Sequence, residues 1–323
     1  MRVIALEEHF VTQELARYGV STASIAQPGA WREASRRLLD LTDERLPEMD
    51  AAGVDIAVLS LNSPGIQAET DPATAVAAAA TVNDFLAAVI ARHPGRFAGF
   101  AALPLQDPAA SAKELERAVT ELGLRGALVN AHTGGRYLDD PSLRGVWERA
   151  EGLDVPLYLH PANGAGQAHV LSGHPELEGP MWSWGTDTAT HALRLIFGRV
   201  FDDFPGAKLI LGHMGEGLPF TLWRLDSRWG FHDHHGIELN RGKPSEYLRH
   251  NLYITTSGVC DAPPLLCALL ALGADHILFG TDYPFESMTE ATAFLANAPV
   301  SKADRAKIGW RNASALLRID NRL

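Results

Sequence analysis

The chain has 323 residues, of which 46% are hydrophobic and 21% are charged, a composition typical of a globular protein with a sizeable core and not of a disordered chain. The formal net charge is -11 at pH 7, and it is spread along the chain. Nucleic acid and anionic membrane both require clustered Lys and Arg, so we expect neither as a partner and take a small molecule as the partner class.

The N-terminus, MRVIALEEHF, places acidic residues directly after a short apolar stretch, a pattern of neither a secretory signal nor a transit peptide. We expect no apolar run long enough to cross a bilayer. Cys260 and Cys267 are seven residues apart on a predicted helix, and we expect both to pack in the core rather than to form a disulfide or bind a metal. These features predict a cytoplasmic protein.

Short β-type segments recur along the chain, separated by helical patterns with apolar residues three and four positions apart. The predicted strands are residues 3–10, 56–62, 97–103, 126–131, 156–160, 208–213, 252–257 and 276–281. Eight such strands alternating with helices predict an α/β fold, a closed (β/α)8 TIM barrel, in one domain over residues 1–323. A doubly wound sheet would more often carry a glycine-rich loop after its first strand, which here ends in Glu-Glu-His.

Two connections are too long to be simple turns, residues 11–45 after the first strand and residues 161–185 after the fifth. Both leave the C-terminal end of a strand, where this fold places its active sites. Long loops in a compact domain are usually functional. We therefore expect both to cover the C-terminal mouth of the barrel.

Metal-capable side chains stand at the ends of several predicted strands. Glu7 and His9 lie two apart on the first strand and should share a face. His160 ends the fifth strand, His213 the sixth, and Asp282 follows the eighth. A lone His at a strand end is more often a structural residue, but this convergence predicts a metal site. Imidazole and carboxylate groups are ligands expected for Zn²⁺ or Mn²⁺.

Other polar residues near these positions have a different interpretation. Glu8 points to the opposite face from Glu7 and His9, which predicts a supporting or helix-facing residue rather than a ligand. The run of residues 232–235, His-Asp-His-His, is rich in metal-binding types. Consecutive residues on a polar loop do not converge on one ion, so we predict a solvated loop there.

Several runs of sequence carry a resemblance to a known family. They are ALEEHF, PLYLHP, THALRLIFGRVFDDFP, LILGHMGEGLPF with the WRLD that follows it, ITTSG, and GADHILFGTDYPFE. In this order and spacing, over nearly the whole chain, they resemble the amidohydrolase-related metal-dependent decarboxylases. Within that family the resemblance is greatest to the γ-resorcylate and 2,3-dihydroxybenzoate decarboxylases.

The resemblance implies one divalent metal ion, Zn²⁺ or Mn²⁺, and no organic cofactor. It implies metal ligation by Glu7, His9, His160 and Asp282, and catalytic roles for Asp282, His213 and Glu216. Hydrolases of the wider superfamily usually begin with His-x-His, whereas this chain has Glu-x-His. The two-metal members also carry a carboxylated Lys after the fourth strand, where this chain reads GALVNA. A binuclear hydrolase is therefore disfavoured.

The implied substrate is a small aromatic acid, an ortho-hydroxylated benzoate such as a dihydroxybenzoate. Direct loss of CO2 would leave an aryl carbanion, so the ring carbon must be protonated first, and Asp282 is the expected acid. An ortho phenolate pushes electron density to that carbon and can share the ion with the carboxylate. His213, oriented by Glu216, would supply and balance protons. The reaction should be reversible.

The expected substrate contacts are Asn130, Arg224, Phe285, Trp182 and Trp184. Arg224 has a structural alternative, an ion pair with Asp226. The two tryptophans have another, packing in a subunit interface. Members of the family commonly form tetramers, so we expect a homo-oligomer, a tetramer or dimer. Residues 18–31 lack an aromatic match to the expected ring-stacking residue, which leaves the ring substituents open.

Two alternatives remain at this point. One is a mononuclear metal-dependent hydrolase of a lactone or amide, in which His213 or Asp282 would activate a metal-bound water. The other is a noncatalytic barrel that serves as a binding protein. The second gives no reason for a complete set of metal ligands beside a His and Glu pair.

Overall fold

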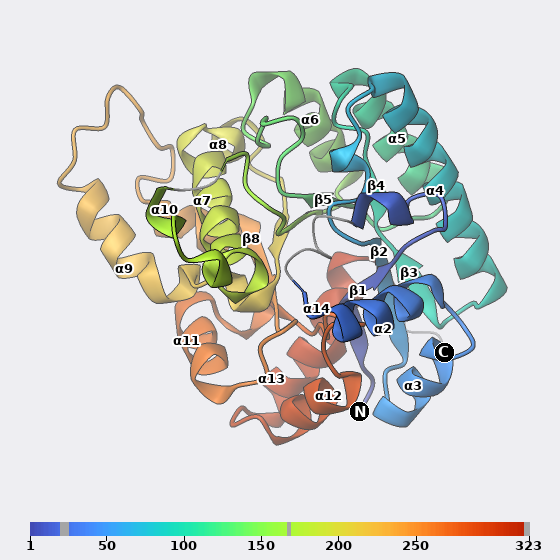
Figure 1. Cartoon of the computed structure of the whole chain (residues 1–323). Coiled ribbons are helices and arrows are strands. Elements are labelled where there is room, and N and C mark those ends of the chain that lie inside the picture. The colour runs from blue at the N-terminus through green and yellow to red at the C-terminus, as the bar shows by residue number, and fades with distance from the viewer. Residues whose placement is uncertain (20–25, 167–168, 320–323) are drawn as a thin grey trace.

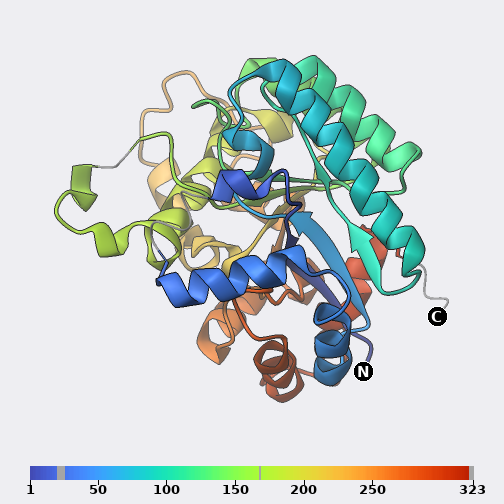
Figure 2. The ribbon, with the colours of Figure 1, turned by 45° about the vertical axis from the view of Figure 1, so that its right-hand side comes forward.

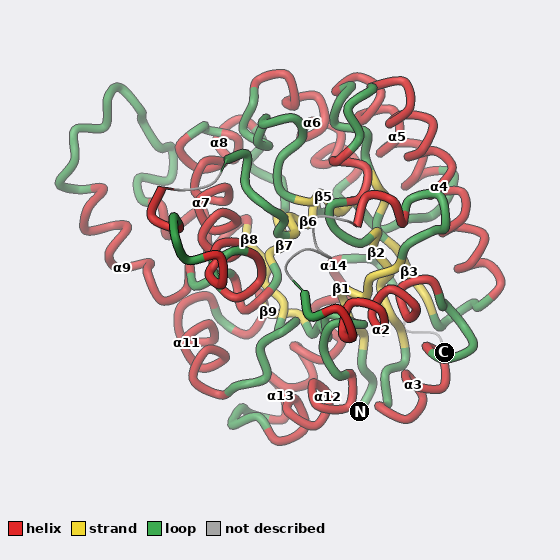
Figure 3. Tube along the Cα trace, in the orientation of Figure 1, coloured by secondary structure: helices red, strands yellow, loops and turns green. Residues whose placement is uncertain are grey.

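The computed structural model describes residues 1–19, 26–166 and 169–319, and in it a ring of parallel strands is surrounded by helices (Figures 1 and 3). The strands are β1 Ile4–Phe10, β2 Ile56–Leu61, β3 Phe97–Gly99, β4 Ala101–Ala102, β5 Ala127–Asn130, β6 Leu157–His160, β7 Leu209–Leu211, β8 Leu252–Thr255 and β9 Ile277–Leu278. The helices are α2 Pro28–Leu39, α3 Arg45–Ala52, α4 Pro72–Arg92, α5 Pro108–Thr120, α6 Arg144–Leu153, α7 Ser183–Phe197, α8 Val200–Asp203, α9 Leu218–Trp229, α10 Pro244–Asn251, α11 Ala262–Leu272, α12 Met288–Asn297, α13 Lys302–Ala306 and α14 Asn312–Leu316.

The strands form a closed barrel. Hydrogen bonding follows the order β1-β2-β3 in one sheet and β4-β5-β6-β7-β8-β9 in the other, and every pairing is parallel. The predicted strand 97–103 is divided at Phe100, whose N donates to Leu59 O on one side, while Ala101 N donates to Gly126 O on the other. A bridge between Leu6 and Gly280 joins β1 to the segment after β9. The predicted (β/α)8 barrel is confirmed.

Apolar side chains fill the structure in two layers. The larger cluster lies between strands and surrounding helices and includes Leu59, Val129 and Leu211. A smaller cluster combines inward-facing strand residues with residues of the C-terminal helix, among them Ile4, Leu6, Ile56, Val58, Ala98, Phe100, Leu128, Tyr158, Ile210, Leu278, Ala313, Leu316 and Leu317. Apolar side chains therefore fill the interior of the barrel, as this fold requires. The metal-capable residues predicted from the sequence lie at or near the C-terminal ends of the strands.

Helix α4 corrects one expectation from the sequence. It has 21 residues, and an 18-residue stretch of it has a mean hydropathy of 1.6, so by length and composition it could cross a membrane. The expectation that no apolar run approaches this length is therefore wrong. A helix in a globular protein can meet the same criterion. Here its buried residues, including Ala79, Val82 and Leu86, belong to the core cluster, and its contacts include β3 and β4.

The two long connections contain more regular structure than expected. Residues 11–45 include helix α2, which has Pro28 in its first turn and lies across the front of the barrel in Figure 2. Residues 161–185 contain short 3-10 turns before α7 begins at Ser183. Both connections contribute walls to the C-terminal mouth, as predicted.

The prediction that both cysteines pack in the core is wrong. Cys260 is exposed in the turn that precedes α11, and Cys267 on α11 is only partly buried. Asp261 begins α11 by accepting a hydrogen bond from Ala262 N, so Cys260 lies outside the helix that was expected to carry both thiols. Both cysteines are free thiols.

Candidate active site

A cavity of about 750 Å³ opens at the carboxyl ends of the strands. His160, His213 and Asp282 lie on its floor, Trp31 of α2 forms part of one wall, and residues 180–186 form another. Ligand pockets usually measure 300–1,000 Å³, so the space suits a small molecule. The lining combines apolar walls with titratable groups at the floor, as a site for a polar aromatic ligand requires.

Four metal-capable residues form one cluster, Glu7, His9, His160 and Asp282, and His160 and Asp282 of this cluster line the cavity. A ligand atom from each lies within 4.8 Å of the others. His9 Nε2 is 3.3 Å from Asp282 Oδ1, and His160 Nε2 is 3.5 Å from Glu7 Oε1. The four residues come from β1, the last position of β6 and the segment after β9, so barrel closure brings the predicted ligands together.

The donor set of this cluster fits a divalent cation. Glu7 Oε1 and His9 Nε2 are buried without a hydrogen-bond partner among the described residues. Buried polar atoms are normally paired, and unpaired ones are costly. A cation between two carboxylates and two imidazoles would provide the missing partner. Oxygen and nitrogen ligands of this kind suit Mn²⁺ and Zn²⁺.

Glu7 and His9 reach the cluster by a different route from the one expected. The pairing of β1 with β2 shifts register between Ala5 and Glu8, and Glu7 has a φ of 64°. The simple two-residue alternation is therefore interrupted by a bulge, a device that redirects side chains next to active sites. His9 is also oriented by Ser60 Oγ, 3.3 Å from its Nδ1, which leaves Nε2 directed to Asp282.

Three buried hydroxyl groups contact one oxygen of Glu7. Tyr158 donates to Glu7 Oε2 at 2.5 Å and Thr255 at 3.1 Å, and Ser257 donates to the same atom. Burial raises the pKa of Tyr158 well above its usual value, and the charge of Glu7 adds to this, so the phenol stays a proton donor. These contacts occupy Oε2 and leave Oε1 for the cluster.

Gly212 provides the space that Glu7 occupies. A Cβ atom at residue 212 would lie 2.5 Å from Glu7 Oε1 and 2.7 Å from Oε2. No real side chain tolerates such a contact, so this close approach requires glycine. Neither Gly212 nor the hydroxyl groups were identified from the sequence. Tyr158 is two positions before His160 on one strand, and this spacing was the available signal.

His213 and Glu216 form a pair beside the cluster. His213 Nδ1 is 2.7 Å from Glu216 Oε1, and His213 Nε2 is 3.7 Å from both Glu7 Oε1 and Asp282 Oδ2. The turn after β7 holds them, with φ of 47° at His213 and 55° at Glu216. Burial opposes the charged imidazolium, but Glu216 and Glu7 outweigh it and hold the pKa of His213 well above its usual value. The protonated form of His213 is therefore favoured, and this residue can act as a proton donor at the floor of the cavity.

Asp282 joins the cluster to this pair. Its φ of 68° is a strained conformation of the kind found at functional sites. Burial opposes ionisation, but the neighbouring imidazoles of His213 and His9 hold the pKa of Asp282 below its usual range. These shifts favour the ionised form of Asp282 and the protonated form of His213.

Glu8 lies outside the cluster, as predicted, and connects β1 to the Asp282 segment. Its carboxylate accepts from Thr281 Oγ1 at 2.8 Å, and burial raises its pKa to about 8. The fully buried Arg45 donates to His9 O, and its guanidinium lies 4.4 Å from the ring centre of Tyr283. These contacts fix the backbone on both sides of the metal-capable side chains.

The predicted substrate contacts divide into two groups. Phe285, Trp182 and Trp184 line the cavity. Asn130 is buried and does not line the cavity. Its backbone N donates to Gln67 Oε1. The structure does not bring Asn130, the buried last residue of β5, to the cavity, so its predicted role as a substrate contact is not supported.

The prediction that Arg224 contacts the substrate is also not supported by the structure. It lies exposed on α9 and does not line the cavity. The alternative partner, Asp226, instead accepts from Ser245 N and Oγ, at 3.0 and 2.6 Å. The helical turn directs Arg224 outward, which the WRLD motif alone could not reveal.

The range 18–31 supplies an aromatic wall after all. Residues 20–25 lie outside the described part of the chain, but Trp31 at the end of the range lines the cavity. Tyr18 turns away and donates to Glu69. The sequence pattern missed Trp31 because it lies on α2 and not in an irregular loop.

The histidine-rich run 232–235 holds no metal cluster within the described residues. Most of it is exposed, and His234 stacks on Trp229 with ring centres 3.6 Å apart. The prediction of a solvated loop is confirmed.

Comparison with known proteins gives consistent matches over the whole fold. The amidohydrolase family profile matches residues 9–319. The γ-resorcylate decarboxylase of Polaromonas sp. strain JS666 is 44% identical over 324 residues, which cover 98% of each chain. A crystal structure of 2,6-dihydroxybenzoate decarboxylase with 2,6-dihydroxybenzoate has a TM-score of 0.92 at 42% identity, covering 99% of this chain and 100% of that one. A dihydroxybenzoic acid decarboxylase from Polaromonas sp. JS666 with bound manganese and 2-nitroresorcinol has a TM-score of 0.90 at 44% identity, covering 98% and 97%.

Proposed function

Because the chain belongs to the amidohydrolase family, we propose that its site carries out the metal-dependent, nonoxidative decarboxylation of an ortho-hydroxylated benzoate. The protein is then a carboxy-lyase, like its γ-resorcylate and 2,6-dihydroxybenzoate decarboxylase relatives. The observation that carries this proposal is the buried cluster of four metal-capable side chains, with two unpaired ligand atoms, beside a His and Glu pair at the floor of a cavity. The hydrolase alternative is not favoured, since these relatives are decarboxylases.

The residues that would hold the metal ion are Glu7, His9, His160 and Asp282. Mn²⁺ has the better support, because a relative of this fold binds it, and Zn²⁺ also suits the ligands. When bound, the ion supplies positive charge that anchors the phenolate and carboxylate oxygens of the substrate. Burial of His160 lowers its pKa well below the usual value, so it stays neutral and able to ligate.

Two side chains, His213 and Asp282, hold and deliver the proton that the reaction consumes. His213 holds a proton because Glu216 and Glu7 favour its charged form, and its Nε2 is 3.7 Å from Asp282 Oδ2. We assign Asp282 as the group that delivers this proton to the ring carbon bearing the carboxylate. Glu216 keeps the imidazole aligned through the 2.7 Å contact with Nδ1.

The decarboxylation conserves atoms and charge. The ring carbon gains one proton, the bond to the carboxylate breaks, and its electron pair restores the aromatic ring as CO2 leaves. One proton is consumed for each CO2 released, and no oxidant or organic cofactor is needed. The same residues serve the reverse carboxylation at high bicarbonate.

Phe285, Trp182, Trp184 and Trp31 give the ring its walls. Phe285 lies close to the floor, with its ring centre 6.0 Å from that of His9. Flat aromatic side chains around a planar ligand provide large contact area and exclude water. They select for an aromatic acid over an aliphatic one.

We also propose that the chain forms a homo-oligomer, a tetramer or dimer, in the cytoplasm. Large apolar side chains are exposed on and just after α9, with Phe220 83%, Trp223 78% and Phe231 77% exposed. Such groups of exposed aromatics commonly mark protein interfaces. Light scattering coupled to gel filtration should give a mass of two or four chains, and Trp223→Asp should reduce it.

The test of the catalytic proposal is CO2 release from a panel of ortho-, meta- and para-hydroxybenzoates. Metal-loaded protein should release CO2 from the ortho-hydroxylated acids, and chelator-treated protein should not. Restoring Mn²⁺ to the treated protein provides the control for irreversible damage. No release from any acid by protein with a measured full metal content would contradict the proposal.

A further inference from the structure

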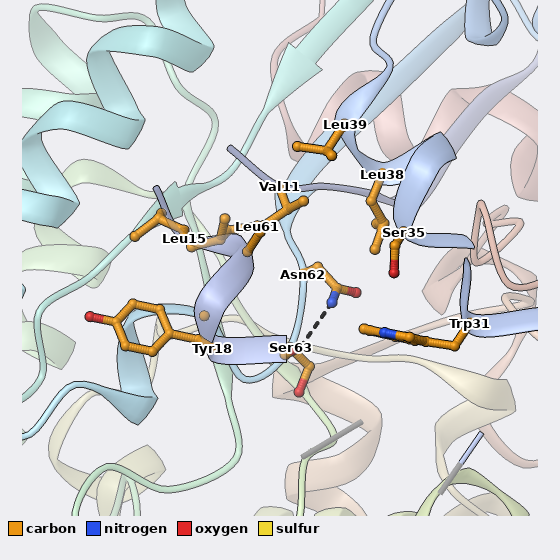
Figure 4. A pocket seen from close by; sticks show the side chains of 12 residues that line it. Val11, Leu15, Tyr18, Trp31, Ser35, Leu38, Leu39, Leu61, Asn62 and Ser63 are labelled. Atoms are coloured by element: carbon orange, nitrogen blue, oxygen red, sulfur yellow. Dashed lines mark hydrogen bonds between the residues drawn. The ribbon is translucent and has the colours of Figure 1, made fainter. Parts of the chain in front are cut away.

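A second, smaller cavity of about 50 Å³, shown in Figure 4, has lining residues in common with the active-site cavity. Trp31, Asn62 and Ser63 line both cavities, so the two share a wall. Figure 4 shows Trp31 reaching from α2 toward Ser63, with Leu38 on the same helix.

This side pocket lies close to the metal-capable cluster. Its floor is built from the carboxyl ends of β1 and β2, where Val11 is two residues after His9. Asn62 N donates to Phe10 O at 2.9 Å, which joins the two strand ends. Ser63 Oγ donates to the carbonyl of Pro161, the residue after His160, at 3.1 Å.

The pocket is apolar. Aliphatic groups dominate its lining, contributed by Val11, Leu15, Leu38, Leu39 and Leu61. The polar groups of its aromatic and amide neighbours are used elsewhere, since Tyr18 donates to Glu69, and Asn62 Nδ2 donates to Ser63 O at 2.9 Å. A trapped water needs two to four polar partners, and apolar cavities instead take apolar groups.

Its size limits what it can take. An apolar cavity of about 150 Å³ accommodates one benzene molecule, which has six carbons. In proportion, a pocket of about 50 Å³ accommodates about two carbons. A methyl or ethyl group fits this space, whereas a second ring does not.

We propose that this side pocket is a subsite for a small alkyl substituent, of one or two carbons, on the ring of the substrate. The inference rests on the proposed function for the identity of the ring and adds to it a preference for alkylated hydroxybenzoates. One methylene in a hydrophobic pocket changes selectivity by roughly 10- to 200-fold. A methyl or ethyl group at the matching ring position should therefore improve affinity by at least roughly tenfold.

The experiment measures binding of phenols, the products of the reaction, so that it does not depend on turnover. Manganese-loaded protein is titrated by calorimetry with resorcinol and with methyl- and ethylresorcinols substituted at each free ring position. Ser35 lines the pocket from α2 and is only partly buried, so Ser35→Leu should fill the space without disturbing the core. Ser35→Ala removes the same hydroxyl but leaves the pocket open, which makes it the matched control. Leu39→Ala, at an exposed position of the lining, should enlarge the pocket and shift the best probe to a longer chain.

The expected result is a roughly tenfold or greater alkyl preference in the wild type and in Ser35→Ala, reduced to less than about twofold in Ser35→Leu. Equal affinity for resorcinol and all its alkyl derivatives, no binding of any alkylated phenol, or an unchanged preference in Ser35→Leu would overturn the inference. Loss of the proposed function would be seen separately, as no CO2 release from the parent acids despite an intact alkyl preference in binding.

Discussion

Substitution of Tyr158 by Phe tests whether the buried hydroxyl groups prepare Glu7 for the metal ion. Tyr158 is fully buried, and its hydroxyl donates to Glu7 Oε2 at 2.5 Å. Tyr158→Phe removes only this oxygen and keeps the ring that packs 5.9 Å from Phe100. The fold should remain intact, because the ring fills the same space.

The magnitude follows from the contacts that remain. A hydrogen bond to a charged group contributes about 1.5–3 kcal/mol, and partners that orient metal ligands typically change metal affinity by about 10- to 100-fold. Thr255 and Ser257 still donate to Glu7 Oε2 in the variant, so the lower end applies. We expect metal affinity to fall by about 1.5 kcal/mol, roughly tenfold.

The assay is titration of metal-free protein with Mn²⁺, followed by the electron paramagnetic resonance signal of the free ion. Tyr253→Phe is the matched control, because Tyr253 on β8 is partly buried and stacks on His276 rather than on the cluster. An affinity unchanged within twofold in a folded Tyr158→Phe protein, or a tighter one, would refute the role given to the hydroxyl groups.

Four further changes have defined outcomes. Gly212→Ala should displace Glu7 and weaken metal binding more than roughly tenfold, measured as bound metal after dialysis, because the new Cβ would lie 2.5 Å from Oε1. His160→Ala should lose metal and CO2 release together, so full metal content in an inactive variant would contradict its role as a ligand. Asp282→Asn should keep its circular dichroism spectrum but lose turnover, and a near-normal rate would rule out Asp282 as the acid. The pKa of His191 is lowered to about 3, chiefly by burial, so this residue stays neutral when folded but takes a proton on unfolding below about pH 6.5. Protonation of His191 in the unfolded chain should therefore lower the free energy of unfolding by about 2 kcal/mol as the pH falls from 7 to 5. Urea titrations at the two pH values should show a loss smaller by about this amount for His191→Gln than for the wild type.

The barrel and the floor of its site were predictable because both depend on short-range patterns. His160 ends an apolar strand and Asp282 follows one, and parallel strands in a closed barrel must end at one mouth. The prediction for Glu7 and His9 was right about their meeting but wrong about the cause, since the φ of 64° at Glu7 interrupts the alternation. A backbone bulge of this kind depends on the closure of β1 against its neighbours.

The residues that support the cluster were less predictable because their partners are remote in sequence. Ser257 and Tyr158 reach Glu7 across separations of 250 and 151 residues. Arg224 and Asn130 were misjudged because their side chain directions depend on helix rotation and local packing. Trp31 was missed because a helix, and not a loop, places it in the cavity wall.

The central claim is tested most directly by the stoichiometry of decarboxylation in heavy water. Manganese-loaded and chelator-treated protein would each be given 2,6-dihydroxybenzoate in D2O, with CO2 and phenol quantified together. The proposed function predicts one CO2 for each resorcinol formed, one deuterium at the carbon that carried the carboxylate, and no product without metal. Metal-loaded protein that releases no CO2, or product formation that persists without metal, would contradict the account.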